Sequence, residues 1–184
     1  MPAMRRVGVY CGSKAGGDPA FRAAAEKTAQ ALLARGHGLV YGGASVGLMG
    51  AVCDAVLAGG GEAIGVIPRT LTAREVAHRK LPDLRIVDSM HERKALMVEL
   101  ADAFVVLPGG IGTLDELFET YTWAALGLHA KPLGLLNVAG YFDGLLAFLD
   151  HVVEQGFLDP AARLRLHVDT DPARLLDRFD ATRH

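Results

Sequence analysis

A glycine-rich turn between an apolar segment and a helix-forming segment is the part of this sequence best suited to chemistry. It runs from Leu107 to Glu116 and reads LPGGIGTLDE. Glycines let the backbone approach a ligand closely. A helix predicted to begin near Thr113 would direct its first N–H groups and the positive end of its dipole at an anion. The turn therefore predicts a phosphate-binding site with the carboxylate of Glu116 beside it.

The same residues allow a second interpretation of Glu116. Thr113 and Glu116 have the spacing of a capping box, in which the glutamate bonds back to the start of its own helix. Ser89 and Glu92 have this spacing too, and we assign that pair to capping because no glycines precede it. The Pro-Gly-Gly-x-Gly run before Thr113 favours a functional role for Glu116.

Two adjacent cations follow Ser89 in the sequence. Arg93 and Lys94 fall in the first turn of a predicted helix, where the dipole disfavours positive charge, so they indicate an anionic ligand. Ordinary surface charge is the alternative. Glu75 lies in a polar connection, residues 68–80, that is either a lid or a solvated loop. Spacing alone favours the plainer alternative for the cations and for Glu75.

Several other chemistries find no support in the sequence. The run from Tyr41 to Gly50 has neither dinucleotide-binding nor P-loop spacing, which leaves a tight turn, a ligand contact, or both. We find no serine-nucleophile elbow and no metal-ligand spacing, so we expect no metal and no cofactor. A net charge of −2 offers no basic field for nucleic acid. Cys11 and Cys53 suggest neither a zinc site nor a disulfide.

The elements that must position these residues alternate along the chain. Apolar strands and helices in turn predict a doubly wound, Rossmann-like α/β sandwich with a parallel sheet, formed by a single domain over residues 1–184. Three glycine-rich connections, residues 12–17, 42–50 and 109–112, should meet at the carboxyl edge of that sheet. The chain shows no signal peptide or membrane-spanning run, so we expect a soluble cytoplasmic protein. The predicted strands are 7–11, 38–41, 63–67, 84–87, 103–107, 133–136 and 164–168, and the predicted helices are 19–35, 46–58, 89–100, 113–126, 142–154 and one from 171.

At this point a family resemblance becomes specific. The run from Met90 to Lys94, followed by that from Pro108 to Glu116, resembles the paired signature of the LONELY GUY family. Further similar stretches extend the resemblance over roughly residues 5–160: Cys11 to Ser13, Tyr41 to Gly50, Tyr121 to Trp123 and Lys131 to Asn137. Two positions depart from the family pattern, Ala44 in place of a glycine and Lys14 in place of a serine.

The resemblance implies a function. Members are cytokinin riboside 5′-monophosphate phosphoribohydrolases, Rossmann-like homodimers that release a base and ribose 5-phosphate from AMP or from N6-substituted forms such as N6-isopentenyladenosine monophosphate. It implies that Arg93 and Glu116 are catalytic. Glu116 would stabilise the cationic ribosyl centre and activate water, while Arg93 would hold the ribose phosphate and offset charge in the leaving base. The expected substrate-binding residues are Lys94, Gly109, Gly110, Ile111, Gly112, Thr113, Leu114, Asp115, Glu75, Thr122, Ser13, Gly43 and Gly47.

Three alternatives compete with this interpretation. A module that binds nucleotides or the molybdenum cofactor without hydrolysis would need the glycine-rich turn but not the pair Arg93 and Glu116. A lysine decarboxylase would need a pyridoxal phosphate site on a Schiff-base lysine, and nothing in the sequence resembles one. A purely structural protein is hard to reconcile with three glycine-rich connections at one sheet edge.

Overall fold

A computed structural model describes residues 5–72 and 77–182 of the chain. Seven strands form one sheet in the order β4-β3-β2-β1-β5-β6-β7, and every pairing is parallel. The predicted doubly wound parallel sheet is thereby confirmed. The strands are β1 Arg6–Tyr10, β2 Gly38–Tyr41, β3 Ala63–Pro68, β4 Asp83–Val87, β5 Ala103–Val106, β6 Leu133–Leu136 and β7 Leu166–Asp169.

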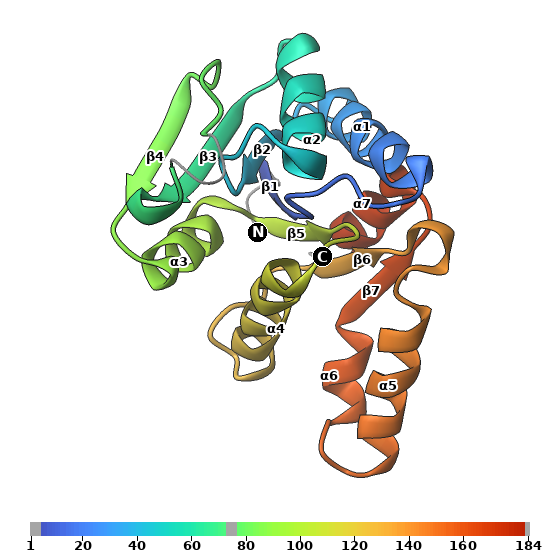
Figure 1. Cartoon of the computed structure of the whole chain (residues 1–184). Coiled ribbons are helices and arrows are strands. Elements are labelled where there is room, and N and C mark those ends of the chain that lie inside the picture. The colour runs from blue at the N-terminus through green and yellow to red at the C-terminus, as the bar shows by residue number, and fades with distance from the viewer. Residues whose placement is uncertain (1–4, 73–76, 183–184) are drawn as a thin grey trace.

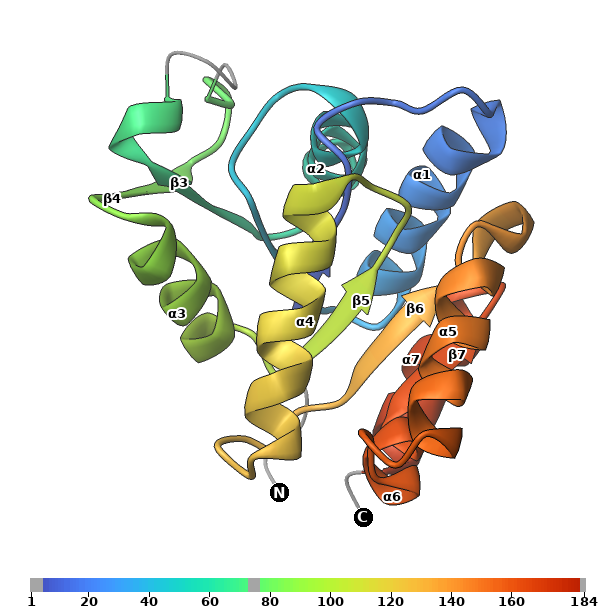
Figure 2. The same cartoon turned by 60° about the horizontal axis from the view of Figure 1, so that its bottom comes forward.

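Helices cover both faces of the sheet (Figures 1 and 2). One face carries α1 Pro19–Ala34, α2 Gly47–Ala58 and α7 Pro172–Ala181. The other carries α3 Met90–Leu100, α4 Ile111–Ala125, α5 Asp143–Glu154 and α6 Pro160–Leu164. Two short 3₁₀ helices, Arg69–Leu71 and Val138–Gly140, follow β3 and β6. A separate apolar core fills the space between the sheet and each helical layer.

Aspartate–proline pairs start several of these helices, as the sequence indicates for two of them. The Asp18 carboxylate accepts from the Ala20 N–H at 2.8 Å, and Asp171 accepts from the Arg174 N–H at 3.0 Å. A third pair, Asp159 with Pro160, starts α6, a helix that was not predicted. The strand predicted at 164–168 therefore begins only at Leu166, because α6 occupies the residues before it.

The strand order reverses at the centre of the sheet. β1 lies between β2 and β5, so the chain winds one way from β1 to β4 and the other way from β5 to β7. The connections that leave β1 and β5 therefore depart in opposite directions and open a crevice at the carboxyl ends of the two strands. Ligands of open parallel sheets bind at such reversal points.

Candidate active site

A pocket of about 400 Å³ opens at the carboxyl ends of β1 and β5. All three glycine-rich connections meet there, as predicted. The Gly12 N–H donates to the Pro108 carbonyl at 3.1 Å, and the Leu48 N–H donates to the Gly12 carbonyl at 3.0 Å. The volume of the pocket falls within the range of roughly 300–1,000 Å³ that is typical of small-molecule sites.

The predicted phosphate cradle forms one wall of this pocket. A Cβ on Gly109 would lie 2.1 Å from Thr113 Oγ1 and 2.9 Å from the Gly12 nitrogen, so this position accepts only glycine. Gly110 is the N-cap of α4 and has no side chain to cap the helix. A Cβ added to Gly110 would have no atom beyond its chain neighbours within 4 Å. The first N–H groups of α4 are therefore available to an anion in the pocket.

The start of α4 corrects one element of the sequence analysis. The helix begins at Ile111 and not near Thr113, so Thr113 lies inside the first turn. A capping box requires its serine or threonine at the N-cap position, and Thr113 does not occupy it. The capping alternative for Thr113 and Glu116 is therefore wrong. By contrast, Ser89 is the N-cap of α3 and its Oγ accepts from the Glu92 N–H at 3.1 Å, as predicted.

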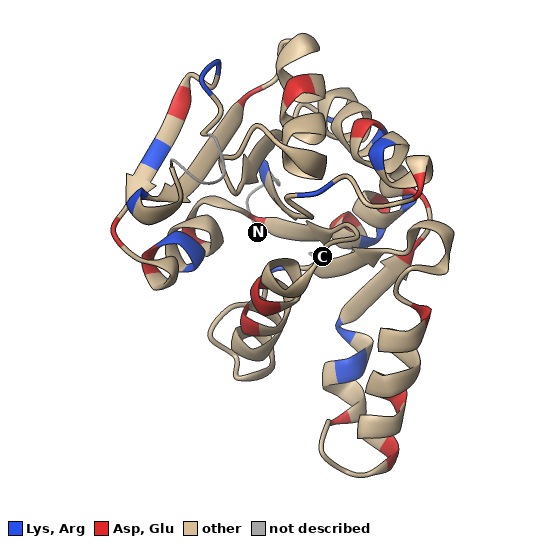
Figure 3. Cartoon of the chain, viewed as in Figure 1, with Lys and Arg blue, Asp and Glu red and all other residues tan. Residues whose placement is uncertain are grey.

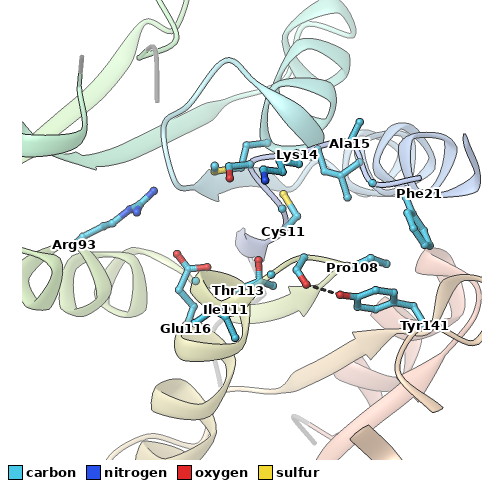
Figure 4. Close-up of a pocket in the computed structure, with 18 residues that line it drawn as sticks. Cys11, Lys14, Ala15, Phe21, Arg93, Pro108, Ile111, Thr113, Glu116 and Tyr141 are labelled. Carbon is cyan, nitrogen blue, oxygen red and sulfur yellow. Dashed lines mark hydrogen bonds between the residues drawn. The ribbon is translucent and has the colours of Figure 1, made fainter. Parts of the chain in front are cut away.

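Arg93 enters the pocket from α3 (Figure 4). The residue is only 4% exposed, which rules out ordinary surface charge. Its Nη2 donates to the Gly42 carbonyl at 2.7 Å and its Nε donates to the Val66 carbonyl at 3.0 Å. Two carbonyls at the carboxyl ends of β2 and β3 thus hold the guanidinium in a fixed orientation.

Glu116 enters the pocket from α4, on the same side as Arg93 (Figure 4). It is 9% exposed. Secondary to burial, its negative charge contributes to the raised pKa values of Tyr10 and Cys11. Burial, and to a smaller extent the negative charge of Glu116, raises the pKa of the Cys11 thiol in the floor of the pocket. Cys11 is therefore a weaker acid than an exposed thiol.

Lys94 follows Arg93 in sequence but points elsewhere. Its Nζ lies 3.0 Å from Asp115 Oδ2 and also contacts the Glu119 carboxylate, both on α4. Burial alone would lower the pKa of Lys94. The hydrogen bonds to Glu119 and Asp115 outweigh this effect, so the pKa of Lys94 is raised. Lys94 is not part of the pocket lining formed by the described residues.

The other predicted site residues divide into two groups. Those that line the pocket are Ser13, Gly109, Gly110, Ile111, Gly112 and Thr113. Those that the described structure places outside the lining are Gly43, Gly47, Leu114, Asp115 and Thr122, and Glu75 lies outside the described residues. Gly47 still shapes the pocket, because its φ is +60° and a Cβ on it would lie 2.3 Å from the Ser13 carbonyl carbon.

Sequence reasoning missed the aromatic end of the pocket. Phe21 and Tyr141 line it with their ring centroids 5.5 Å apart, across the cradle from Arg93. The Tyr141 hydroxyl donates to the Gly109 carbonyl at 2.5 Å and so fixes the cradle from outside. Tyr141 follows the carboxyl end of β6, and that position in the predicted sheet was the signal that could have found it.

The described residues contain neither a candidate metal site nor a candidate membrane-spanning helix. Within residues 5–72 and 77–182, no group of three or more histidine, cysteine, aspartate or glutamate side chains could hold a metal ion. No described helix is long and apolar enough to cross a membrane. Both cysteines are free and buried.

Known proteins with similar folds include proteins named for binding or carrying the molybdenum cofactor. The molybdenum cofactor binding protein of Rippkaea orientalis has a TM-score of 0.73 with this chain, covers 99% of both chains, and is 19% identical. A molybdenum cofactor carrier protein of Chlamydomonas reinhardtii has a TM-score of 0.71 over 98% of both chains at 20% identity. At these identities the similarity shows the Rossmann-like fold alone.

Sequence comparisons are more specific. Residues 49–179 match the family described as "Possible lysine decarboxylase". A probable cytokinin riboside 5′-monophosphate phosphoribohydrolase of Oryza sativa subsp. japonica is 50% identical over 177 residues, which cover 96% of this chain and 83% of that one. A cytokinin riboside 5′-monophosphate phosphoribohydrolase of Arabidopsis thaliana is 49% identical over 95% of this chain and 80% of its own. The chain therefore belongs to the LONELY GUY family of cytokinin riboside 5′-monophosphate phosphoribohydrolases, which shares the lysine decarboxylase description.

Proposed function

We propose that this protein hydrolyses the N-glycosidic bond of adenosine 5′-monophosphates and releases the free base and ribose 5-phosphate. The observation that carries the proposal is one pocket lined by an open helix N-terminus, a buried guanidinium and a buried carboxylate. The names of relatives about 50% identical over most of the chain support the same reaction. AMP and N6-isopentenyladenosine monophosphate are the two candidate substrates.

The 5′-phosphate binds at the start of α4. Gly110 and the residues after it offer backbone N–H groups and the positive end of the helix dipole. Lys14 lines the rim of the same pocket and adds a positive charge. Phosphate binding away from the scissile bond positions the ribose, so its binding energy contributes to the rate as well as to affinity.

Glu116 acts at the ribosyl carbon. Cleavage of the C1′–N9 bond leaves its electron pair on the purine and builds positive charge on the ribose, as in other glycoside cleavages. The Glu116 carboxylate stabilises that charge and accepts a proton from the attacking water, whose oxygen bonds to C1′. The proton is then available to the departing base, so that charge is conserved over the reaction.

Arg93 supplies the complementary positive charge. Its guanidinium is held by the Gly42 and Val66 carbonyls, so little reorganisation is needed when charge develops in the transition state. Arg93 holds the ribose phosphate and offsets negative charge in the leaving half of the substrate. The remaining predicted contacts come from Ser13 and the cradle glycines, which line the pocket.

We further propose that the protein is a cytoplasmic homodimer. Exposed apolar side chains support an interface on the face of the sheet that carries α4 and α5. Light scattering on the purified protein tests the dimer, and a monomeric mass at micromolar concentration would contradict it. The exposed apolar residues are Ile111, Phe118, Phe148 and Phe157.

Incubation with each candidate substrate tests the reaction. Purified protein is mixed with AMP or with N6-isopentenyladenosine monophosphate, and chromatography and a ribose 5-phosphate assay detect the products. We expect both products in equal amounts, and comparison of kcat/KM ranks the substrates. Adenosine is the control, because it lacks the phosphate that the cradle binds and should react poorly. Tight nucleotide binding without product would favour a non-hydrolytic binding module.

A further inference from the structure

Helix α3 directs two consecutive cations to different places. Arg93 reaches the pocket and the strand ends, while Lys94 crosses to α4. Figure 3 shows the positive charge of α3 and the negative charge of α4 on neighbouring helices. Lys94 is 8% exposed, so this contact is built into the packing of α3 against α4.

The partners of Lys94 flank Glu116 on α4. Asp115 immediately precedes Glu116, and Glu119 follows it by one helical turn. The Lys94 ammonium therefore connects the helix that carries Arg93 to the helix segment that carries Glu116. The ammonium is buried, while the Glu119 side chain is 21% exposed and the Asp115 side chain 53% exposed. A buried cation held by two acceptors on one helix favours a fixed position of the elements it joins.

The contact also balances charge around Glu116. Three carboxylates, Asp115, Glu116 and Glu119, lie within one and a half turns of α4. The single positive charge of Lys94 contacts both carboxylates that flank Glu116 and offsets part of their negative charge. Without the ammonium, the negative charges of those two carboxylates would act unopposed on a third carboxylate in the partly buried site.

We propose that Lys94 is a positioning residue that sets the placement and charge of Glu116 through Asp115 and Glu119, and does not itself contact the substrate. This inference rests on the proposed function, because its effect is on the turnover that Glu116 supports. It replaces the expectation, drawn from the family resemblance, that Lys94 binds substrate.

Removal and compensation of the charge test the proposal. Lys94→Met keeps the length and apolar character of the side chain and removes the ammonium. The triple variant Lys94→Met/Asp115→Asn/Glu119→Gln removes the ammonium together with both carboxylate charges. Lys27→Met, on exposed α1 surface across the sheet, is the matched control. For each variant we would measure kcat and KM, the Kd for AMP by calorimetry, and the melting temperature.

The expected pattern separates positioning from substrate contact. Lys94→Met should lower kcat by about 10- to 100-fold and leave the Kd for AMP within about twofold. The triple variant should recover most of the lost kcat, because the flanking charges are gone. A structural role alone would lower the melting temperature without this recovery.

The opposite pattern would overturn the inference. A Lys94 that touches substrate predicts a Kd raised at least tenfold in both the single and the triple variant, with no recovery of kcat. Because the triple variant removes the flanking carboxylate charges together with the ammonium, it tests this even if Lys94→Met fails to fold. The Kd measurement also needs no turnover, so a wild-type protein that binds AMP without hydrolysing it would refute the proposed function while the contact question is still answered.

Discussion

The helices α3 and α4 start from the same sequence pattern and end with opposite uses of their N-termini. Each follows a strand of the sheet, and each has a serine or threonine at or near its start, three residues before a glutamate. In α3 the pattern closes on itself: Ser89 Oγ accepts from the Glu92 N–H, and the Glu92 carboxylate accepts from the Asp88 N–H at 2.8 Å. Helix α3 thus caps its own N-terminus with the side chains of Ser89 and Glu92.

Helix α4 leaves its first turn open. It begins two residues before Thr113, at Ile111, behind an N-cap glycine. Glu116 therefore lies in the second turn and lines the pocket. The difference teaches that the glycines ahead of the pattern decide whether a glutamate at this spacing caps a helix or serves a ligand.

Removal of the carboxylate charge from each helix is the strongest test of this contrast. Glu116→Gln should lower kcat by about 10³-fold, because the amide cannot stabilise a cation or accept the proton of water. Glu92→Gln is the matched control and should keep kcat within about twofold, since its amide oxygen can still accept from Asp88 N–H. Steady-state kinetics with AMP measure both. Equal effects in the two variants would remove the distinction between the helices.

Arg93 sharpens the contrast from the side of α3. Arg93→Lys should lower kcat/KM by about 10²-fold, because an ammonium cannot satisfy the Gly42 and Val66 carbonyls in the geometry of a guanidinium. Circular dichroism should show an unchanged helix content. A variant with normal kinetics would mean that positive charge alone, without orientation, is sufficient at this position.

Conversion of α4 into a self-capped helix breaks the comparison deliberately. In Gly110→Ser the new hydroxyl can accept from the first-turn N–H groups and occupy space that the phosphate needs. We expect a gain of a few tenths of a kcal/mol in unfolding free energy and a Kd for AMP raised about tenfold. Gly144→Ser, at the start of α5 with open space around it, is the control. An unchanged Kd would place the phosphate elsewhere.

Loss of the cap on α3 should have the smallest effect on function. Ser89→Ala removes the acceptor of the Glu92 N–H and should cost about 1 kcal/mol of stability, or about 2–4 °C in melting temperature. The kcat should be unchanged, since Ser89 lies away from the pocket lining. A large loss of kcat would show that the first turn of α3 controls the placement of Arg93.

Much of the fold could be predicted because its signals are local. Apolar strand runs and glycine stops set the element order, and Asp18 and Asp171 mark helix starts by a bond to their own backbone. The same local logic located the cradle, because a strand, glycines and a helix are consecutive in the chain. The omission of α6 shows the limit of a signal that was present at Asp159 but not applied.

The candidate site could be predicted only in part. The place of Glu116 beside the glycine-rich turn was predicted, because the two are adjacent in the sequence. The meeting of three loops was predicted, because parallel strands bring their carboxyl ends together. Tyr141 was not, since it reaches Gly109 from a distant segment after β6. The burial of Arg93 was also beyond the sequence, because its acceptors are carbonyls on two other strands.

By itself, the sequence determined the order of strands and helices, the glycine positions and the identity of the ionisable residues. Only the tertiary structure decided what those residues face. Consecutive residues of a helix point about 100° apart, so Arg93 and Lys94 cannot share one target. Which of them faced the pocket and which faced α4 depended on how α3 packs against the sheet and its neighbour. That packing joins segments that are distant in the chain, and local sequence pattern carries no information about it.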